Sequence, residues 1–444
     1  MQTESSTPIQ VAERLALFPD STHLKDGALT IAGQELASLA QQFGTPLYLY
    51  DRATLDAAAR RYASALEFYE GPSAAITYAG KAYLCRAIAE WAAARGLWLD
   101  CTGQTEIRTA QSGNLPRERI LVHGVNKSDA DLQAALEAAG TLVVDNLHEL
   151  QRLRDLRQPL PDLWLRLLPG AIVQTHHSHT QTGQPGSKFG MTPADFLEAA
   201  ALCRRDALPL KGLHFHLGSN FRDPLPLAQA IDLGLELAHQ AGFSGDWHFS
   251  PGGGWGMAYH EDELPQPDLE EYVHLILEAV SQGCCKHSLP MPSLHLEPGR
   301  SLIARAGVAL YRVGAVKREG GLTWLLVDGG MTDNPRHAMY GSRYTALPVA
   351  GTQRDLSVRT HVAGPLCESG DVLIESLLLP AMEPGELLAV PMSGAYHLSM
   401  SSNYNGRPRP AVLWLEAGSC RLIQRRETPG DLMRRDLGLY DPAA

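Results

Sequence analysis

Eight short apolar runs along residues 74–300 constrain the fold of this chain more than any other feature of its sequence. Segments with apolar residues at helical spacing separate the runs, for example YLCRAIAEWAAARG and DADLQAALEAAG. Strands that are apolar along their whole length are typical of parallel sheets covered on both faces. The runs are 74–82, 97–103, 119–125, 141–146, 163–169, 212–219, 246–254 and 293–300.

The number of these runs distinguishes two folds. A doubly wound sheet and a closed barrel both alternate strands with helices. Eight strands in regular alternation with helices favour the closed (β/α)8 arrangement. We therefore expect an α/β protein in which residues 42–302 form a TIM barrel.

The pattern changes after the eighth run. Residues 308–330, 356–366, 385–396 and 411–426 form β-like segments joined by turns, without regular helices between them. We expect a second, mostly β domain over residues 303–444, built as a sandwich or barrel. Residues 1–41 are expected to be an N-terminal extension that adds a strand to this domain, with the first 20 residues loosely ordered.

The chain carries 38 basic and 49 acidic side chains, a formal charge of −11. An acidic chain without a basic cluster is a poor partner for nucleic acid or for an anionic membrane surface. No apolar run approaches the ~20 residues that span a bilayer. The N-terminal sequence lacks the basic start and apolar core of a secretory signal. We expect neither a nucleic-acid nor a membrane partner.

Seven cysteines are scattered along the chain, and none forms a CxxC pair. An odd number without a disulfide pattern indicates a reducing compartment, so a cytoplasmic location is expected. Cys284, Cys285 and His287 lie close together in the sequence. We interpret them as a helix end with incidental thiols and not as a metal site.

Polar or glycine-rich residues stand at the end of every apolar run. Barrel enzymes build their active sites at the carboxyl ends of the strands, so these residues are the candidate site. Eight such endings on one rim are hard to explain by structure alone. They are Lys81, Asp100, His123, Asp145, Arg166, His216, Gly252 to Gly254 and Glu297 to Arg300.

Lys81 ends the apolar segment ITYAGKA. A lysine inside a barrel is costly to desolvate unless it is paired or used covalently. Burial lowers the basicity of lysine, which favours Schiff-base chemistry. The alternative interpretation is a solvated lysine at the rim, and only the neighbouring motifs favour the first.

Two glycine-containing motifs follow the seventh and eighth runs. The backbone N–H groups of Gly252 to Gly254 can approach an anion, and TIM barrels often bind phosphate at this place. Glu297 can keep the nitrogen of a pyridine ring protonated, and Arg300 can bind a carboxylate or phosphate with two hydrogen bonds. The alternatives are a plain tight turn and a structural Arg–Glu pair.

Two further motifs carry candidate residues. His214 and His216 alternate on one strand, so they share a face; His216 can stack on a planar ring, and Gly218 and Ser219 are expected near its phosphate. A zinc site lacks a clear third ligand, and no metal is expected. Cys367 can act as a general acid and the adjacent glutamate can hold an ammonium group, although a lone cysteine is usually inert.

Taken together, these motifs resemble the fold-type III pyridoxal-phosphate (PLP) decarboxylases, and within them most closely the diaminopimelate decarboxylases. The resemblance covers residues 42–425. It implies an alanine racemase-like barrel with a mostly β C-terminal domain, and PLP as the cofactor. Its markers, in the order of the family, are YAGKA, HGVNKS, TGQPGSKFG, HFHLGS, GGGWG, EPGR, DGGMTDNPRHAMYG, GPLCESGD and GAYHLSMSSNYNGRPRP.

The resemblance also implies residue roles. Lys81 binds the cofactor covalently and His216 stacks on its ring, while Glu297 contacts the pyridine nitrogen. The remaining cofactor contacts are Ser219, Gly252, Gly253, Gly254, Pro298, Gly299, Arg300 and Tyr396.

For the substrate, the resemblance implies that Arg300, Arg336 and Tyr340 bind carboxylates, that Glu368 binds the distal ammonium group and that Tyr396 contacts the substrate as well as the cofactor. Cys367 protonates the carbanion left when carbon dioxide departs. The cysteine and the glutamate beside it are donated across a dimer interface in this family, which implies a homodimer with shared sites. The implied reaction converts meso-2,6-diaminopimelate to L-lysine in lysine biosynthesis.

Several positions depart from the diaminopimelate decarboxylase pattern. Residues 100–107 read DCTGQTEI, which is partly similar to ornithine decarboxylases. His337 replaces a usual proline and Asn220 a usual glutamine. The polar segment 175–179, which contains His176 and His179, is either an active-site lid or a solvated loop.

Three alternatives follow. Ornithine, arginine or a siderophore-pathway amino acid is the nearest rival substrate, although Arg336 and Tyr340 favour one with a second carboxylate. An amino-acid racemase typically places arginine at the pyridine nitrogen, and Glu297 argues against it. A non-catalytic regulator is expected to have lost Lys81 or Cys367, and both are present.

Overall fold

The computed structural model describes residues 7–175 and 181–439. Its contacts divide the chain into two compact units. The barrel unit comprises Asp56–Met257 and Pro265–Ile303, and the β unit comprises Met1–Leu55, Ala258–Leu264 and Ala304–Ala444. The sequence-based boundaries after residues 41 and 302 stay predictions.

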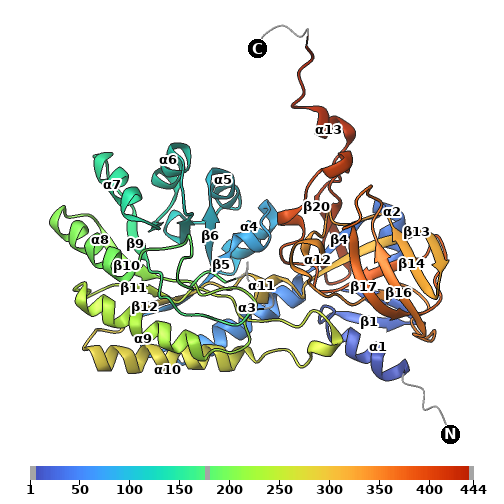
Figure 1. The fold of residues 1–444 in the computed structure, drawn as a ribbon, viewed down its shortest axis with the longest axis horizontal. Helices are drawn as coiled ribbons and strands as arrows, with labels where there is room; N and C mark the ends of the chain where they lie inside the picture. The colour runs from blue at the N-terminus through green and yellow to red at the C-terminus, as the bar shows by residue number, and fades with distance from the viewer. Residues whose placement is uncertain (1–6, 176–180, 440–444) are drawn as a thin grey trace. The chain divides into compact units, whose positions relative to one another are not determined.

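The barrel unit contains the predicted barrel (Figure 1). Eight parallel strands close on themselves in the order β10-β11-β12-β5-β6-β7-β8-β9. Each strand falls inside or overlaps one of the eight apolar runs, which confirms the fold class. The strands are β5 (Ala74–Ala79), β6 (Trp98–Thr102), β7 (Ile120–His123), β8 (Thr141–Val144), β9 (Asp162–Arg166), β10 (Leu210–His214), β11 (His248–Ser250) and β12 (Ser293–Leu296).

Local sequence explains where the helices between these strands start. Ser128 forms a capping box with Asp131 at the start of α6, and Thr192 caps α8 ahead of Pro193. Asp268 caps α10, which ends where Ser288 adopts the left-handed conformation. The helices are α3 (Arg52–Leu66), α4 (Arg86–Ala94), α5 (Gln104–Ser112), α6 (Asp129–Ala138), α7 (Leu147–Asp155), α8 (Pro193–Arg205), α9 (Leu225–Gln240) and α10 (Leu269–His287).

Large rings fill part of the barrel interior. The Trp164 indole stacks on the His248 imidazole, with centroids 5.3 Å apart, and His248 Nδ1 lies 3.1 Å from His295 Nε2. Gly212 leaves room for this stack, because a Cβ there would come within 2.5 Å of the Trp164 ring. The rings make this part of the barrel a packed core and not a channel.

The β unit is built on a mixed sheet in the order β17-β16-β14-β13-β4-β19-β20, with β18 paired to β13 and β15 paired to β18. Strand β4 lies between β13 and β19, so a segment that precedes the barrel in sequence completes this sheet. The strands are β4 (Leu47–Asp51), β13 (Gly307–Glu319), β14 (Leu322–Val327), β15 (Leu347–Pro348), β16 (Val358–Ala363), β17 (Val372–Leu379), β18 (Leu387–Val390), β19 (Ala411–Glu416) and β20 (Ser419–Gln424).

The start of the chain differs from expectation. Helix α1 (Thr7–Leu15) is followed by Leu17 and Phe18, which are fully buried, so the expected loose order of residues 1–20 is wrong from residue 7 onward. Strands β1 (Thr22–Lys25), β2 (Ala28–Ile31) and β3 (Gln34–Glu35) form a small sheet of their own. An antiparallel bridge joins Ala28 to Ala350. Apolar side chains at the start of the chain therefore belong to the β-unit core.

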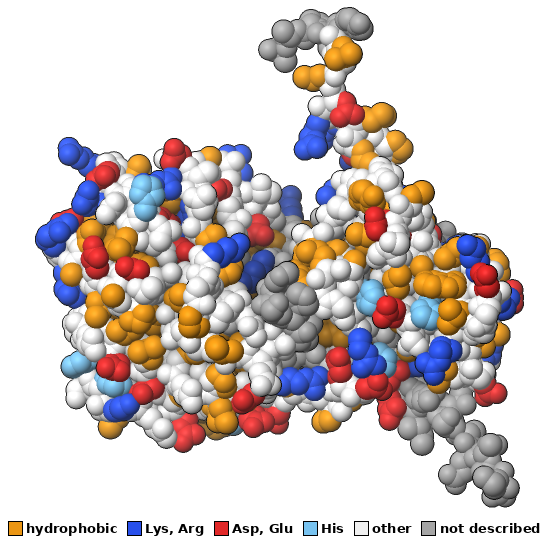
Figure 2. All heavy atoms as spheres, viewed as in Figure 1, with side chains coloured by type: hydrophobic (Ala, Val, Ile, Leu, Met, Phe, Trp, Pro, Cys, Tyr) orange, Lys and Arg blue, Asp and Glu red, His pale blue; other side chains and the backbone are white. Residues whose placement is uncertain are grey.

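Basic and acidic side chains are interspersed on the face of the molecule seen in Figure 2. Among the described residues, no helix has both the length and the apolar character that crossing a bilayer requires.

A buried ion pair links two strands of the barrel to the helix that follows them. Lys127 Nζ donates to Glu149 Oε1 at 2.7 Å and to the carbonyl oxygens of Gly124 and Val143, each at 2.8 Å. The two charged side chains are only 2% and 4% exposed. All three hydrogens of the ammonium group are therefore used, which offsets part of the cost of its burial.

Replacing Lys127 with methionine should lower the free energy of unfolding by about 3–5 kcal/mol, because it leaves the Glu149 carboxylate buried without its counter-charge. Urea unfolding followed by circular dichroism measures this change. Lys286→Met is the matched control, since Lys286 pairs with Asp232 at 2.7 Å but both side chains are exposed. Loss of that pair should cost no more than about 1 kcal/mol. Equal losses in the two variants would contradict the role of the buried pair.

Candidate active site

The predicted rim residues do gather at the carboxyl ends of the barrel strands. Lys81 lies on the short turn Gly80–Ala82 that follows β5, and its side chain is exposed. The expectation of a desolvated lysine is therefore wrong for this structure. The Lys81 charge nevertheless acts on Asp100, Glu106 and His216, which places its ammonium group at this end of the barrel.

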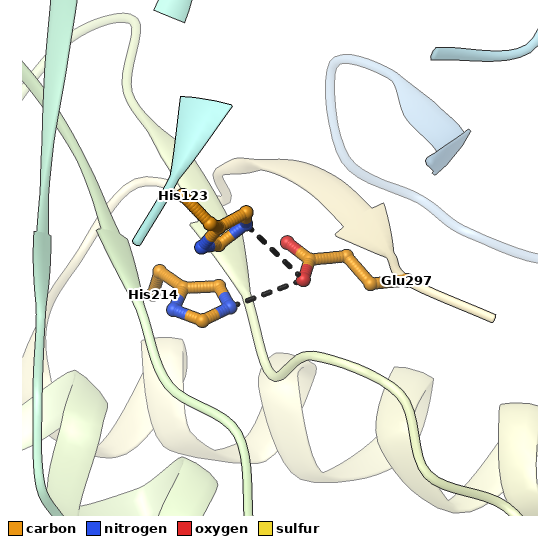
Figure 3. A group of neighbouring side chains, drawn as sticks. All are labelled: His123, His214 and Glu297. Carbon is orange, nitrogen blue, oxygen red and sulfur yellow. Dashed lines mark hydrogen bonds and ion pairs between the residues drawn. The ribbon is translucent and has the colours of Figure 1, made fainter. Parts of the chain in front are cut away.

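Glu297 is the centre of the buried polar cluster at this rim (Figure 3). Its Oε2 accepts a hydrogen bond from His214 Nε2 at 3.1 Å and lies 3.6 Å from His123 Nε2. Its Oε1 accepts a hydrogen bond from Ser250 Oγ at 2.7 Å. Burial alone would raise the pKa of Glu297, but the two histidines outweigh burial and hold it well below its ordinary value. The carboxylate is thus kept ionised in a buried place.

Other ionisable side chains surround this cluster. Burial raises the pKa of Asp100 despite the nearby charges of His123 and Lys81, and burial raises the pKa of Glu106 to about 7. Arg166 Nη1 lies 3.5 Å from Asp145 Oδ1. Such perturbed groups gathered at one end of a barrel are typical of a functional site.

The three glycines after β11 approach neighbouring groups more closely than any side chain would allow. A Cβ on Gly253 would come within 2.0 Å of the Glu297 carbonyl oxygen, and a Cβ on Gly254 within 1.9 Å of the Gly218 carbonyl oxygen. The Gly253 N–H donates to His216 Nδ1 at 3.3 Å. Only glycine fits here, because the turn packs directly against neighbouring backbone.

Arg300 and Ser219 complete the rim. Arg300 Nη2 donates to Ser219 Oγ at 2.9 Å, and the arginine is only 4% exposed. The arginine begins the short helix α11 (Arg300–Ile303), directly after Pro298 and Gly299. A guanidinium group and a hydroxyl group thus stand beside the glycine turn in the barrel unit.

The β unit brings together a second set of predicted residues. Arg336 is 3% exposed and begins helix α12 (Arg336–Tyr340). Its guanidinium carbon lies 5.4 Å from the ring centroid of Tyr340 and 5.6 Å from that of Tyr396. The Tyr259 ring is 5.8 Å away. Aromatic faces at these distances attract the cation and restrict its orientation.

Cys367 and Glu368 are exposed on the loop between β16 and β17. The loop is held by buried Asp371, whose carboxylate accepts hydrogen bonds from the backbone N–H groups of Met331 and Leu366 at 2.7 and 2.8 Å. The Cys367 N–H donates to Asn405 Oδ1 at 3.3 Å. The thiol is therefore presented to the surface by an ordered loop.

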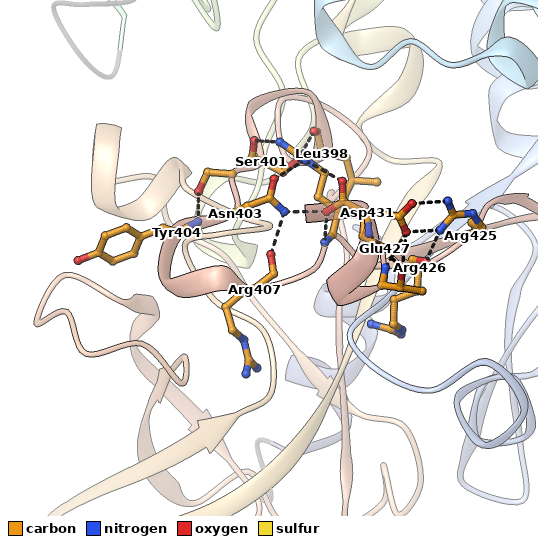
Figure 4. A network of polar contacts seen from close by, with 12 residues as sticks. Leu398, Ser401, Asn403, Tyr404, Arg407, Arg425, Arg426, Glu427 and Asp431 are labelled. Atoms are coloured by element: carbon orange, nitrogen blue, oxygen red, sulfur yellow. Dashed lines mark hydrogen bonds and ion pairs between the residues drawn. The ribbon is translucent and has the colours of Figure 1, made fainter. Parts of the chain in front are cut away.

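The segment that carries Asn405 is itself fixed by a polar network (Figure 4). Arg409 donates to Asn403 Oδ1 at 2.6 Å and to Glu427 Oε1 at 2.9 Å, and Asn403 Nδ2 donates to Glu427 Oε2 at 2.6 Å. The motif SSNYNGRPRP thus folds around one carboxylate. This network supports the loop to which Cys367 is bonded.

Comparison with known proteins identifies the family. A sequence model described as "Pyridoxal-dependent decarboxylase, pyridoxal binding domain" matches residues 52–304. The chain belongs to the pyridoxal-dependent decarboxylases. The diaminopimelate decarboxylase of Actinosynnema pretiosum is 40% identical over 95% of each chain. That of Bacillus subtilis is 38% identical over 95% of this chain and 98% of the relative.

Solved structures agree with this assignment. The diaminopimelate decarboxylase of M. jannaschii superposes with a TM-score of 0.86 at 28% identity, covering 95% of this chain and 98% of that one. The Helicobacter pylori enzyme in complex with L-lysine has a TM-score of 0.80 at 29% identity, covering 90% and 98%. A lysine/ornithine decarboxylase from Vibrio vulnificus, at 24% identity and a TM-score of 0.72 over 86% and 97%, shares the fold.

The residues of the barrel rim fit PLP. An ionised, buried Glu297 suits a protonated pyridine nitrogen, and the glycine turn packs against the Glu297 and Gly218 backbone too closely for any Cβ. Asp100 Oδ1 and His123 Nε2 are buried and accept or donate no hydrogen bond among the described residues. A planar polar cofactor therefore has charge and hydrogen-bonding groups to meet at this rim.

Sequence analysis missed two features of this site. It found no third ligand beside its histidine pair, whereas His123, His214 and Glu297 offer ligand atoms within 4.8 Å of one another. His216 is not part of that group. Sequence analysis placed His123 and Asp100 at the rim from their position at strand ends, but it assigned them no specific role. The His176–His179 loop lies outside the described residues.

Substitution of alanine for Gly254 should weaken PLP binding by at least about tenfold, because the added Cβ clashes with the Gly218 carbonyl and φ is +108°. Titration of apoenzyme with PLP, followed by absorbance, measures the affinity. Gly245→Ala is the matched control: φ is +64° there, but nothing lies within 4 Å of the new Cβ. Undiminished PLP affinity in Gly254→Ala would exclude a role of this turn in cofactor binding.

Acidification should destabilise the fold through His214. Burial lowers the pKa of His214 to about 4. In the unfolded chain this histidine titrates near pH 6.5. Between pH 6.5 and 4 the unfolded chain therefore binds a proton that the folded chain does not, and the free energy of unfolding falls by about 3 kcal/mol.

Urea unfolding between pH 7 and 4.5 tests this prediction. His214→Gln keeps an N–H donor for Glu297 but should lose this part of the pH dependence. His239→Gln, at an exposed histidine, should retain it. Parallel pH profiles for wild type and His214→Gln would refute the assignment.

Proposed function

We propose that this enzyme decarboxylates meso-2,6-diaminopimelate to L-lysine and carbon dioxide with PLP as its cofactor. The observation that carries the substrate assignment is the buried Arg336 guanidinium group, which lies among three tyrosine rings in the β unit. A planar, desolvated guanidinium group binds a carboxylate with two hydrogen bonds. Relatives named diaminopimelate decarboxylase, 36–40% identical over at least 90% of the chain, support the same substrate.

The bound cofactor supplies an electron sink for the charge left when the carboxyl group departs. Lys81 holds the cofactor covalently. Glu297 keeps a proton on the pyridine nitrogen, and His214, His123 and Ser250 keep Glu297 ionised in position for that task. His216 lies against the cofactor ring, and the remaining cofactor contacts come from the glycine turn and the loop after β12.

The cofactor phosphate is assigned to the glycine turn and to Ser219. The contacts implied for Pro298, Gly299 and Arg300 follow from their place directly after Glu297. Backbone N–H groups, a hydroxyl group and a guanidinium group are the donors that an anionic group requires.

The substrate is held by its two charged ends. Arg300, Arg336 and Tyr340 bind carboxylates, Glu368 binds the distal ammonium group, and Tyr396 contacts substrate and cofactor. Cys367 delivers a proton to the reacting carbon after carbon dioxide leaves.

We also propose a homodimer in which Cys367 and Glu368 serve the partner's site. Their exposure on a well-supported loop favours that arrangement, because an ordered, exposed thiol is free to enter another subunit. The cytoplasmic location stays a prediction.

Carbon dioxide release measured in parallel on meso-diaminopimelate, L-ornithine, L-lysine and L-arginine tests the proposal. We expect kcat/KM for diaminopimelate to exceed the others by at least about a hundredfold, because the other substrates leave a buried carboxylate-binding arginine without its partner. Lys81→Ala is the matched negative variant. It should lack both turnover and the near-visible absorption of covalently bound cofactor. A preference for ornithine or arginine would overturn the substrate assignment.

A further inference from the structure

Asn220 joins the loop after β10 to the glycine turn after β11 at two places. Its backbone N–H donates to the Gly254 carbonyl oxygen at 2.9 Å. Its side-chain Oδ1 accepts from the backbone N–H of Met257 at 2.9 Å. Because the Met257 group is a donor, the side-chain atom that faces it must be an oxygen. The asparagine therefore holds the turn on both sides of Trp255, and all these residues lie in the barrel unit.

The backbone of Asn220 is left-handed, with φ of +65°. Most side chains adopt this region only at a cost, and asparagine is one of the few that enters it readily. Both contacts with the turn come from this one residue, and both depend on its backbone conformation. Asparagine thus combines the required φ with the required acceptor. It is also one of the positions at which this chain departs from the diaminopimelate decarboxylase pattern.

Neighbouring contacts fix the loop that carries Asn220. The Phe221 N–H also donates to the Gly254 carbonyl oxygen, at 3.2 Å, and Phe221 forms an isolated parallel bridge with Trp255. The Tyr272 hydroxyl of α10 donates to the Phe221 carbonyl oxygen at 3.0 Å. Glycine permits this close packing, because a Cβ on Gly254 would lie 2.8 Å from the Phe221 ring. The loop that holds the turn is therefore itself attached to the barrel.

The contact with Asn220 sets the direction of a backbone donor in the turn. The Gly254 carbonyl and the Trp255 N–H belong to one peptide unit, and a planar trans peptide points them in opposite directions. Holding the carbonyl toward Asn220 therefore fixes the Trp255 N–H on the other side. Among the described residues, the N–H groups of Gly254 and Trp255 donate to no acceptor. Successive backbone N–H groups of this kind are donors for an anion.

We propose that Asn220 is a positioning residue that holds the glycine turn in the conformation that binds the cofactor phosphate. The inference rests on the proposed function, which assigns the phosphate to this turn and to Ser219. It goes beyond that function, because it makes cofactor affinity depend on a side chain to which no contact with the cofactor is assigned. Ser219 directly precedes Asn220 in the chain, and both parts of the phosphate site thus share one support.

The first test is the affinity of Asn220→Ala for PLP. The variant lacks the acceptor for Met257 and places a residue that disfavours the left-handed region at φ of +65°. Without the two contacts the unliganded turn can relax, and phosphate binding must order it again, which lowers affinity. We expect Kd for PLP to rise at least about tenfold. The cofactor is removed from PLP-loaded enzyme and titrated back, followed by absorbance.

Pyridoxal separates an effect on the phosphate from an effect on the whole site, because it has the ring and aldehyde of PLP without the phosphate. In Asn220→Ala, Kd for pyridoxal should stay within about twofold of wild type, and so should kcat at saturating PLP. Equal weakening of PLP and pyridoxal binding would overturn the proposal, since the asparagine would then support the site as a whole.

Two further variants control for backbone strain. Asn114 is exposed, has φ of +60° and lies in the loop after α5, at the amino end of the barrel strands. Asn114→Ala therefore introduces the same strain far from the turn, and its PLP affinity should not change. Asn220→Gly adopts the left-handed conformation without strain and lacks only the acceptor. Its Kd for PLP should rise about fivefold, even if Asn220→Ala does not fold. Wild-type PLP affinity in Asn220→Gly would rule the inference out.

A failure of the proposed function would look different. If the wild-type enzyme binds pyridoxal as tightly as PLP, the glycine turn does not hold the phosphate, and the phosphate assignment itself is wrong. If the wild type strongly prefers PLP and both Asn220 variants keep that preference, only the role of Asn220 is wrong.

Discussion

A single buried carboxylate organises the chemistry of the barrel unit. Glu297 stays ionised in the interior because one hydroxyl group and two imidazoles face its oxygens. Without them, burial would favour the protonated, neutral acid. These residues lie on or directly after β7, β10, β11 and β12. The ionised state of Glu297 therefore depends on the barrel that brings those strands together.

The β unit uses the same physical solution in a different place. Asp333 lies among tyrosines and a histidine that donate toward it, and burial raises its pKa to about 6. In both units a charged group is buried together with enough hydrogen-bonding partners to limit the cost of desolvation. In the barrel the partners also orient a residue that carries a proposed function, Glu297.

Much of the fold was predictable because its signals are local. Each apolar run corresponds to a strand, and caps such as Ser128 and Thr192 mark helix starts. The placement of β4 between β13 and β19 was not predictable from the sequence. Pairing between residues some 260 and 360 positions apart leaves no local pattern. The helix at the start of the chain was also missed, because its buried face follows from packing in the β unit.

At the candidate site too, the sequence predicted some features and only the structure revealed others. Sequence placed Lys81, Glu297 and the glycine turn on one rim, since parallel strands bring their carboxyl ends together. It did not find that His123 and His214 share one oxygen of Glu297, or that Lys81 is exposed. Those facts depend on side-chain directions and on distances of about 3 Å, which strand positions alone leave undetermined.

The sequence by itself determined the fold class, the family and the residue types at the barrel rim, because hydrophobic period and motif order are written along the chain. The tertiary structure decided which of those groups meet. His397 is an ordinary residue of the segment GAYHLSM in the sequence, and only folding places its two nitrogens between Tyr48 and Tyr344. Hydrogen bonds act over a few ångströms in space, and the order of residues along a chain does not specify such distances.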